Sequence, residues 1–501
     1  MSSQSHVTRR HFNRLIASGA AALAGSSLAS HALAADDAPI DVPWRSDDPH
    51  LSGNFLPVLR ETDASDLRVI AGRIPPDLRG VYMRNGPNPQ YKPISFAYPL
   101  DGDGMIHAVY LEGGRARYRN RFVQTAGLGI ERRVGRAVFP SFAHPAPIDP
   151  AVFRPGDVRA PVKNGAFVNI IRHGDHLLAL NEATTCYEMS MDLETLGQWT
   201  AGTDQPIRMG AHNRRHPRTG DLYAIEYSWR EPIVRVHQLN PSGLLIGTRT
   251  VTLAMPSMIH DFILTERHVV LIVGPAVFDI AAARAGKSML QWRPDLGMRV
   301  ALLPLDGGEP TWVEGDPFFA YHFANGFERG GQIVVDYVHH DRFSFDAGPR
   351  ATFRRMTIDT ARRTLEVAAF SDDLTEFPRI NHRHEALPTR YAYVPTLTST
   401  LDLPEPPSAI FNALLKFDTE TGRSTRHDFG NLIVGEAAFV PRPGGTREDY
   451  GYLAAFAYDP RQGGSRFVLL DARRIESEPV AVVALPQRVP QGLHGNWIER
   501  G

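Results

Sequence analysis

The chain has 501 residues, 43% of them hydrophobic, and its 54 Lys and Arg nearly balance 55 Asp and Glu. The hydrophobic content is sufficient for a large core, while the balanced charge argues against nucleic acid as a partner. No apolar run reaches the roughly 18 residues of a membrane-spanning helix. Cys186 is the single cysteine, which excludes an intramolecular disulfide and argues against a metal site built from cysteines.

Residues 1–34 have the layout of an export signal. The segment 8–12, TRRHF, is a twin-arginine motif, and the weakly apolar stretch 15–29 follows it. Small residues at 32–34, ALA, then offer a cleavage site. We therefore predict recognition by the twin-arginine export machinery, a periplasmic or exported protein, and one mature domain over 35–501.

The remainder of the chain repeats one local pattern, a polar turn followed by a short apolar segment. The turns at 173–175, 219–221 and 266–267 lie about 45 residues apart, the size of a four-stranded propeller blade. Strands are predicted at 176–182, 222–228, 268–274, 332–338, 423–429 and 450–459. We therefore predict an all-β fold, a β-propeller in preference to a large β-sandwich. Residues 278–291 are the best prediction for a helical excursion.

Four histidines stand far apart, each in a distinctive local sequence: His212 in MGAHNRRHP, His260 in PSMIHDFIL, His322 in FFAYHFANG and His494 in QGLHGNW. Imidazole is the commonest metal ligand among side chains. Separations of 48, 62 and 172 residues exclude a local metal-binding motif. Because the inner strands of all propeller blades converge on the central axis, one histidine from each of four blades can meet there.

These histidines lie within longer motifs that resemble the carotenoid cleavage oxygenases, the family of apocarotenoid oxygenases, lignostilbene dioxygenases and the retinoid isomerohydrolase. The motifs run through nearly all of the mature chain in family order, and include 74–89, 101–111, 177–188 and 435–442. The resemblance implies a seven-bladed propeller with helices and loops capping the active-site face. It also implies a non-haem Fe(II) dioxygenase that uses O2 to cleave a conjugated C=C bond to carbonyl products.

Carried over position by position, the resemblance implies a complete metal site. The four iron ligands fall on His212, His260, His322 and His494, and three glutamates that hold ligand rings fall on Glu182, Glu376 and Glu436. Val168 falls where the family commonly has a threonine that crowds an open position at the iron. Since all four histidines and all three glutamates are present, catalysis is favoured over a non-cleaving, ligand-binding propeller.

Other histidines receive structural interpretations. His216 follows His212 closely, but the adjoining Pro217 predicts a turn rather than a second metal ligand. The close pairs 339–340 and 382/384 stand in polar stretches and are predicted to lie at the surface. A four-histidine zinc hydrolase is a further alternative, although catalytic zinc usually keeps three protein ligands and no general base is evident here.

The substrate class is the finer question. Lignostilbene-type relatives bind the substrate phenol with a tyrosine and a lysine, but the lysine position is Asn181 here and the region 135–145 contains no tyrosine. This favours a carotenoid or apocarotenoid over a lignostilbene or phenylpropenoid. Phe327, close after His322, is predicted to line an apolar tunnel for this conjugated substrate. Since a long polyene must come from a membrane, we expect peripheral membrane contact at an apolar patch within 278–290, with Phe139 and Phe142 as further candidates.

Overall fold

The computed structural model describes residues 42–500 except 183, 286, 345–349 and 402–408. These residues belong to the unit Ile40–Gly501. The predicted export signal, 1–34, lies outside the described residues, as does the predicted start of the mature domain. Within the described part, no helix combines the length and the apolar character needed to span a bilayer.

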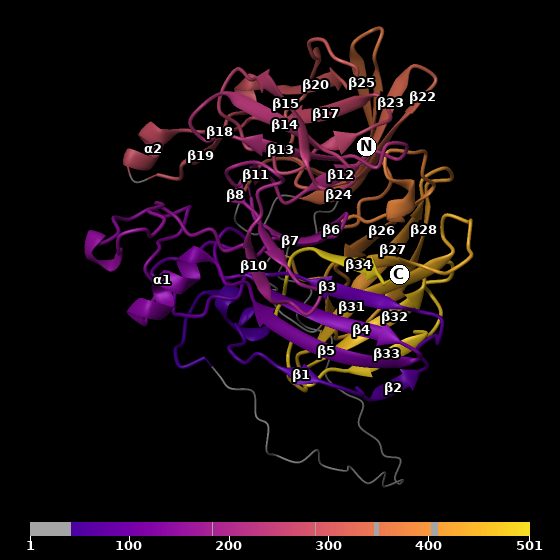
Figure 1. Cartoon of the computed structure of the whole chain (residues 1–501). Helices are drawn as coiled ribbons and strands as arrows, with labels where there is room; N and C mark the ends of the chain where they lie inside the picture. Colours follow the sequence, from indigo (N-terminus) through magenta and orange to yellow (C-terminus); the bar gives the residue numbers. More distant parts are fainter. Residues whose placement is uncertain (1–41, 183, 286, 345–349, 402–408, 501) are drawn as a thin grey trace, which may run out of the picture. The chain divides into compact units, whose positions relative to one another are not determined.

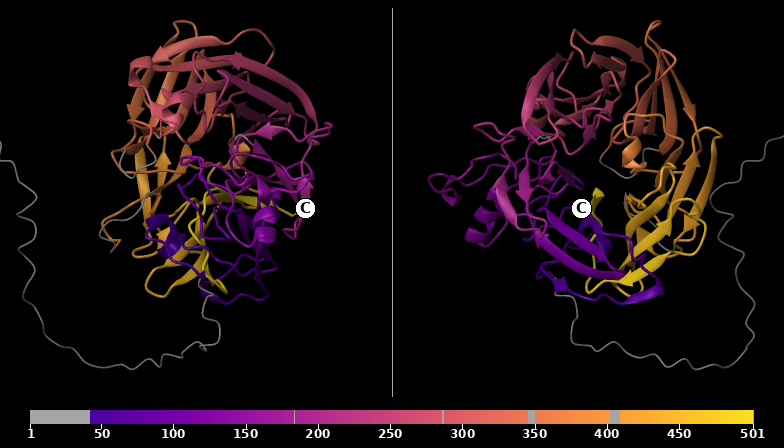
Figure 2. Two further views of the ribbon diagram at one scale, coloured as in Figure 1. Left: turned by 90° about the vertical axis from the view of Figure 1, so that its left-hand side faces the viewer. Right: turned by 45° about the vertical axis from the view of Figure 1, so that its right-hand side comes forward.

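The described strands form seven sheets of three or more strands, which are the blades of a β-propeller (Figure 1; Figure 2). The prediction of an all-β, seven-bladed propeller is confirmed. We number the blades 1 to 7 around the ring and name their strands from the axis outwards. Inner strands of neighbouring blades contact one another, as β34 does with β6 and β16 with β22, and so surround the axis.

The first four blades have the following strands. Blade 1 contains β34 (Gly495–Glu499), β3 (Gly80–Arg84), β4 (Met105–Glu112), β5 (Arg115–Phe122) and β1 (Asp63–Ala64). Blade 2 contains β6 (Asn169–His173), β7 (His176–Leu180), β9 (Tyr187–Met189) and β10 (Thr195–Gln198). Blade 3 contains β12 (Asn213–Arg215), β13 (Leu222–Tyr227), β14 (Ile233–Leu239) and β15 (Leu245–Thr252). Blade 4 contains β16 (Ile263–Leu264), β17 (His268–Val273), β20 (Met298–Pro304) and β21 (Thr311–Gly315).

The last three blades complete the ring. Blade 5 contains β22 (Phe323–Arg329), β23 (Gln332–His340), β24 (Ala351–Asp359) and β25 (Thr364–Ala369). Blade 6 contains β26 (Tyr391–Thr396), β27 (Ala413–Asp418) and β28 (Arg423–Asp428), with bridges from Thr375 and Arg379 to β26 on its inner side. Blade 7 contains β29 (Ile433–Val434) and β30 (Ala438–Pro441), then β31 (Gly451–Asp459), β32 (Gly464–Asp471), β33 (Ala481–Ala484) and β2 (Val69–Gly72).

Two adjacent blades close the ring by pairing strands from opposite ends of the described chain. In blade 1, β34 pairs with β3, with Trp497 opposite Tyr82. In blade 7, β2 pairs with β33, with Val69 opposite Val483. Closure leaves fewer exposed strand edges and ties the C-terminal strand, with the residue before it, to the axis.

The predicted strands are confirmed, and the predicted helix is only partly right. The six predicted segments correspond to β7, β13, β17, β23, β28 and β31. Within 278–291, only α2 (Ile280–Arg284) is helical, between β18 (Ala276–Phe278) and β19 (Leu290–Trp292), which pair with each other. A second two-stranded sheet joins β8 (Thr184–Thr185) to β11 (Arg208–Met209).

Short helical elements complete the described chain. The longest is α1 (Ala126–Val134), whose Thr125 caps the N-terminus by accepting from the amide of Leu128. Figure 1 shows α1 and α2 on the same side of the propeller. The 3-10 turns are η1 (Pro49–Leu51), η2 (Gly53–Phe55), η3 (Pro150–Val152), η4 (Pro294–Leu296) and η5 (His382–His384).

Candidate metal centre

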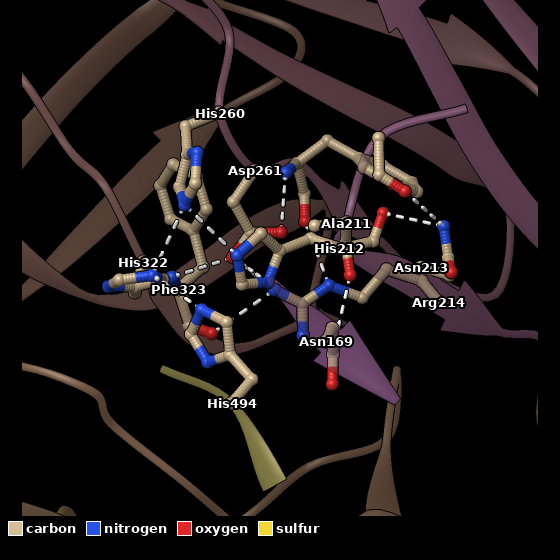
Figure 3. Close-up of polar contacts among 12 residues, drawn as sticks. Asn169, Ala211, His212, Asn213, Arg214, His260, Asp261, His322, Phe323 and His494 are labelled. Carbon is tan, nitrogen blue, oxygen red and sulfur yellow. Dashed lines mark hydrogen bonds and ion pairs between the residues drawn. The ribbon is translucent and has the colours of Figure 1, made fainter. Parts of the chain in front are cut away.

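Four histidines from four blades meet at the axis. They precede the inner strands of their blades: His212 before β12, His260 before β16, His322 before β22 and His494 before β34. Successive Nε2 atoms lie 3.1, 3.3 and 3.2 Å apart in that order, and the four ligand atoms all lie within 4.8 Å of one another (Figure 3). The four side chains that the sequence singled out are therefore brought together.

This donor set fits a single metal ion. Each imidazole offers one nitrogen lone pair to a common point, and lone pairs that face one another repel unless a cation lies between them. With metal–imidazole bonds of about 2.1 Å, neighbouring ligand nitrogens lie about 3.0 to 3.4 Å apart for right-angled to tetrahedral arrangements. The observed spacing falls in this range, so the residues present fit an ion held by imidazoles alone.

Three glutamates hold three of the rings from behind. His260 Nδ1 lies 2.8 Å from Glu182 Oε2, His494 Nδ1 lies 3.0 Å from Glu436 Oε1, and His322 Nδ1 contacts Glu376 Oε2. Because an ionised carboxylate can only accept, the Nδ1 atoms of His322 and His494 carry the proton in their hydrogen bonds to Glu376 and Glu436. Each Nε2 then keeps its lone pair, directed at the centre.

The glutamates come from the three blades that supply no histidine. Glu182 follows β7 in blade 2, and Glu436 lies between β29 and β30 in blade 7. Glu376 lies between the two bridges on the inner side of blade 6. Four blades thus contribute an imidazole and the other three a carboxylate.

Charge at the centre follows from these contacts. Burial alone would raise the pKa of Glu436, but Arg379, with Nη1 3.3 Å from Oε1, and His494 lower it to about 2. Burial and the three other imidazoles hold the pKa of His212 well below its ordinary value. The carboxylate is therefore ionised and the His212 ring neutral, which is the form that binds metal.

His212 lacks the carboxylate that orients the other rings. Its Nδ1 lies 3.9 Å from Asp261 Oδ2, which is beyond hydrogen-bond range. Asp261 instead pairs with Arg214 and accepts from the amides of Phe262 and Phe323 at 2.7 and 3.0 Å (Figure 3). Asp261, which follows His260 in sequence, thus binds the backbone of two blades rather than the ring of His212.

Val168 occupies in blade 2 the position that holds histidine in other blades. It directly precedes the inner strand β6 and is 4% exposed. Its carbonyl accepts from the amide of His494 at 3.1 Å, and its amide donates to the carbonyl of Leu180 at 2.9 Å. An apolar residue therefore stands between the blades of His494 and His212. Its role in crowding an open position stays a prediction.

The two predicted substrate contacts have different surroundings. Asn181 is buried directly before Glu182, and its Nδ2 donates to Asn164 Oδ1 at 3.4 Å. Phe327 lies five residues along β22 from His322, about 16 Å at the rise of an extended strand. Arg329 lies over the Phe327 ring at 5.1 Å, close to the far end of that strand. Both tunnel roles stay predictions, and Phe327 lies away from the histidines.

Two aromatic side chains that the sequence did not single out contact the ligand rings. The Phe377 ring centroid lies 4.9 Å from that of His322 and 5.4 Å from that of His494. The Tyr321 centroid lies 5.7 Å from that of His260. Each adjoins a predicted site residue in sequence, which is the signal that could have identified it.

The histidine pair at 339–340 was predicted to lie at the surface, and this is wrong. His340 is 6% exposed, and its Nε2 donates to Glu376 Oε1 at 3.1 Å, while His339 stacks on Phe318 with centroids 4.7 Å apart. The polar sequence around the pair hides the fact that β23 carries both side chains into the interior. None of the residues in His382–His384 is buried, in line with the prediction for that pair.

His216 forms a turn, as predicted. Its Nδ1 accepts from the amides of Arg218 and Thr219, and its carbonyl accepts from that of Gly220. The ring nitrogens are thereby used within blade 3 and between blades, since Nε2 also contacts the carbonyl of Glu266 at 3.1 Å.

The apolar patch predicted within 278–290 is only partly at the surface. Phe278 is 6% exposed, whereas Ile280 is 36% exposed. Both line a cavity of about 440 Å³, together with Trp229. Phe278 also stacks on Tyr227, with centroids 6.0 Å apart, and burial together with the charge of Glu182 raises the pKa of Tyr227.

Comparison with known proteins places these features in context. Residues 55–499 match the family model described as retinal pigment epithelial membrane protein. The chain is 32% identical to a carotenoid cleavage oxygenase of Mycobacterium tuberculosis, over 90% of this chain and 98% of the relative. It is 30% identical to the apocarotenoid-15,15'-oxygenase of Synechocystis sp., over 86% and 92% respectively. The crystal structure of Pseudomonas brassicacearum lignostilbene dioxygenase is similar with a TM-score of 0.83 at 27% identity, covering 91% of this chain and 99% of that one.

Proposed function

Because the chain belongs to the carotenoid cleavage oxygenase family, we propose that it is a non-haem Fe(II) dioxygenase that cleaves a conjugated C=C bond of a carotenoid or apocarotenoid. The observation that carries the proposal is the convergence of four imidazole nitrogens, with a carboxylate beside three of the rings. When bound there, iron supplies the activation of O2 towards an electron-rich double bond.

The protein's own residues hold the ion, shield it from water and orient the ligand rings. Neutral imidazoles leave the charge of the ion undiminished, and the three carboxylates balance it from behind the ligand rings. Val168 and Phe377, both buried, keep the surroundings apolar and exclude water. The reaction adds both atoms of O2 to one C=C bond and yields two C=O groups. No protein group therefore has to give or take a proton.

A polyene substrate is supported by the uncharged side chains near the histidines, Val168, Asn181 and Phe377. Asn181 carries no charge with which to stabilise a phenolate. The cavity beside Phe278 combines apolar side chains such as Trp229 with charged ones such as Arg230 and Arg293, so it offers a polyene only part of its lining. The relatives named above include an apocarotenoid oxygenase and a lignostilbene dioxygenase. A hydroxylated stilbene is accordingly the rival substrate in the test below.

We also propose that the chain is exported through the twin-arginine machinery and meets its substrate at a membrane surface. The motif TRRHF at 8–12 supports the first point, and the partly exposed Ile280 beside the cavity supports the second. Export in a folded state would let the chain acquire its metal before it leaves the cytoplasm. Replacement of Arg9 and Arg10 by Lys should retain the protein in the cytoplasm, and unchanged export would contradict this proposal.

The experiment that tests the reaction measures O2 uptake and products with the iron-loaded chain. An apocarotenal and a hydroxystilbene are offered in parallel, with His260→Ala as the control. We expect one O2 consumed for each pair of carbonyl products from the apocarotenal, and none from the control. Carbonyl products from the stilbene alone would overturn the substrate class. Isomerised substrate without O2 uptake would overturn cleavage itself.

A further inference from the structure

Glu376 is bound at both oxygens, and one partner is a histidine outside the ligand set. Oε2 accepts from His322 Nδ1 and from the amide of Phe377, while Oε1 accepts from Nε2 of His340 at 3.1 Å. The carboxylate therefore cannot rotate without breaking hydrogen bonds at both of its oxygens.

Strand register carries His340 to this point. β22 and β23 form a hairpin, in which the amide of Val338 donates to the carbonyl of His322 at 3.0 Å. Alternate residues of a strand share a face, so His340 lies on the side of Val338 and His339 on the opposite side. Two backbone hydrogen bonds with Phe319, of 2.8 and 3.0 Å, fix the end of β23.

The other ring nitrogen of His340 makes this residue an unusual choice for a core. Since Nε2 donates to a carboxylate, Nε2 carries the proton and Nδ1 is a bare acceptor. Nδ1 is buried and has no hydrogen-bond partner among the described residues. An unsatisfied buried acceptor destabilises a fold, whereas an apolar side chain of similar size would avoid that loss. The same apolar side chain would leave Glu376 Oε1 without a donor, so the hydrogen bond to Glu376 is what the histidine contributes here.

Glu436, another glutamate of the metal centre, also has a second side-chain partner, Arg379. Glu436 Oε1 is shared between His494 Nδ1 at 3.0 Å and Arg379 Nη1 at 3.3 Å, and Oε2 accepts from the amide of Gly495 at 2.8 Å. Each glutamate thus has a second side-chain partner besides its ligand ring: His340 binds the other oxygen of Glu376, and Arg379 shares the oxygen of Glu436 that accepts from His494. The second partner is the permanently charged guanidinium of Arg379 at Glu436 and the imidazole of His340 at Glu376.

We propose that His340 is a positioning residue of the metal centre: it fixes Glu376, which in turn fixes the ring plane and tautomer of His322. The inference rests on the proposed function only in that the four histidines bind a metal ion, and it is independent of the substrate. Without His340, one oxygen of Glu376 is left unpaired in the interior, and the carboxylate can turn away from His322. The His322 lone pair is then no longer aimed at the common point.

Cobalt(II) binding to the metal-free chain tests this role without turnover. The probe is Co(II) alone, with the dissociation constant taken from competition with a chelator and the ligand geometry from the visible absorption spectrum. His340→Phe removes the donor, His340→Gln keeps an N–H donor, and His339→Phe is the matched control on the opposite face of β23. His340→Leu is a second variant without a donor, for use if the phenylalanine does not fold.

We expect the donor-less variants at 340 to weaken Co(II) binding by about tenfold or more and to shift its absorption bands. His340→Gln should restore affinity to within about threefold, and His339→Phe should keep both affinity and spectrum. A role limited to packing would lower the melting temperature of the metal-free variants but leave the Co(II) spectrum unchanged, and that result would overturn the proposal. Failure of the unaltered chain to bind Co(II) would overturn the metal centre itself, which distinguishes the two failures.

Discussion

Substitution of Glu436 by glutamine isolates the contribution of one buried carboxylate. The side chain is 3% exposed and accepts hydrogen bonds from His494, Arg379 and the amide of Gly495. Glutamine keeps the shape but removes the charge, so Arg379 loses its ionic partner and Glu436 no longer titrates. The effect is to be measured on the metal-free chain, because a bound ion would add its own charge next to His494.

The magnitude follows from the pKa of the carboxyl group. Burial would raise it, but Arg379 and His494 lower the pKa of Glu436 from 4.5 to about 2 in the folded chain. Because the folded pKa lies below the unfolded one, ionisation stabilises the fold above about pH 4.5, and this contribution is lost as the pH falls towards about 2. At about 1.4 kcal/mol per pKa unit, it amounts to about 3 kcal/mol at pH 7 and about 1 kcal/mol at pH 3.

Urea unfolding of the metal-free chain between pH 3 and pH 7 measures this difference. We expect Glu436→Gln to lower the free energy of unfolding most at pH 7 and progressively less as the pH falls. Glu309→Gln, at an exposed position, is the matched control and should have almost no effect. A difference below about 0.5 kcal/mol at pH 7, or one that grows towards low pH, would refute the reasoning.

Three further predictions concern stability. Asp336 is 1% exposed and accepts from Arg355 Nε and Nη2 at 2.7 and 2.8 Å, so Asp336→Asn should lower the free energy of unfolding in urea by about 3 kcal/mol. Phe377 has a φ of 55°, which glycine adopts without strain, so Phe377→Gly should be more stable than Phe377→Ala by about 1 kcal/mol in the same assay. Fe(II) at about 100 times its Kd should stabilise the metal-free chain by about 2.7 kcal/mol in anaerobic urea unfolding, because the ion binds only the folded state.

Each of these predictions has a result that would contradict it. An unchanged free energy of unfolding in Asp336→Asn would mean that the ion pair with Arg355 contributes nothing to stability beyond its burial. An alanine variant at 377 as stable as the glycine variant would remove the argument from backbone strain. Stabilisation by Fe(II) that persists in His260→Ala would assign the ion to a different site.

Strands are predictable from this sequence because the turns that precede them have local signatures. Gly174 and Gly220 have φ values of 57° and 75°, a conformation that favours glycine, and each lies at a turn of an inner hairpin. The helix α1 is not predictable from local sequence in the same way, because Gly127 and Gly129 lower its helix propensity. It forms because Thr125 caps it and because it buries apolar side chains such as Leu128.

The metal centre is predictable only in part. Local sequence marks His212 and His494 as unusual, but their proximity depends on closure of the ring by β34, which no local pattern reports. The resemblance to a known family supplies the ligand positions and their glutamates. It does not supply His340, whose contact with Glu376 depends on how far β23 extends towards the neighbouring blade. Phe327 lies away from the histidines because the five extended residues from His322 to Phe327 span a greater distance than a side chain can reach.

Metal analysis of the chain purified without oxygen tests the central claim most directly. The account predicts about one iron atom per chain, and almost none when His212, His260, His322 or His494 is replaced by alanine. Full iron content in any of these alanine variants, or zinc in place of iron in a chain that turns over its substrate, would contradict it.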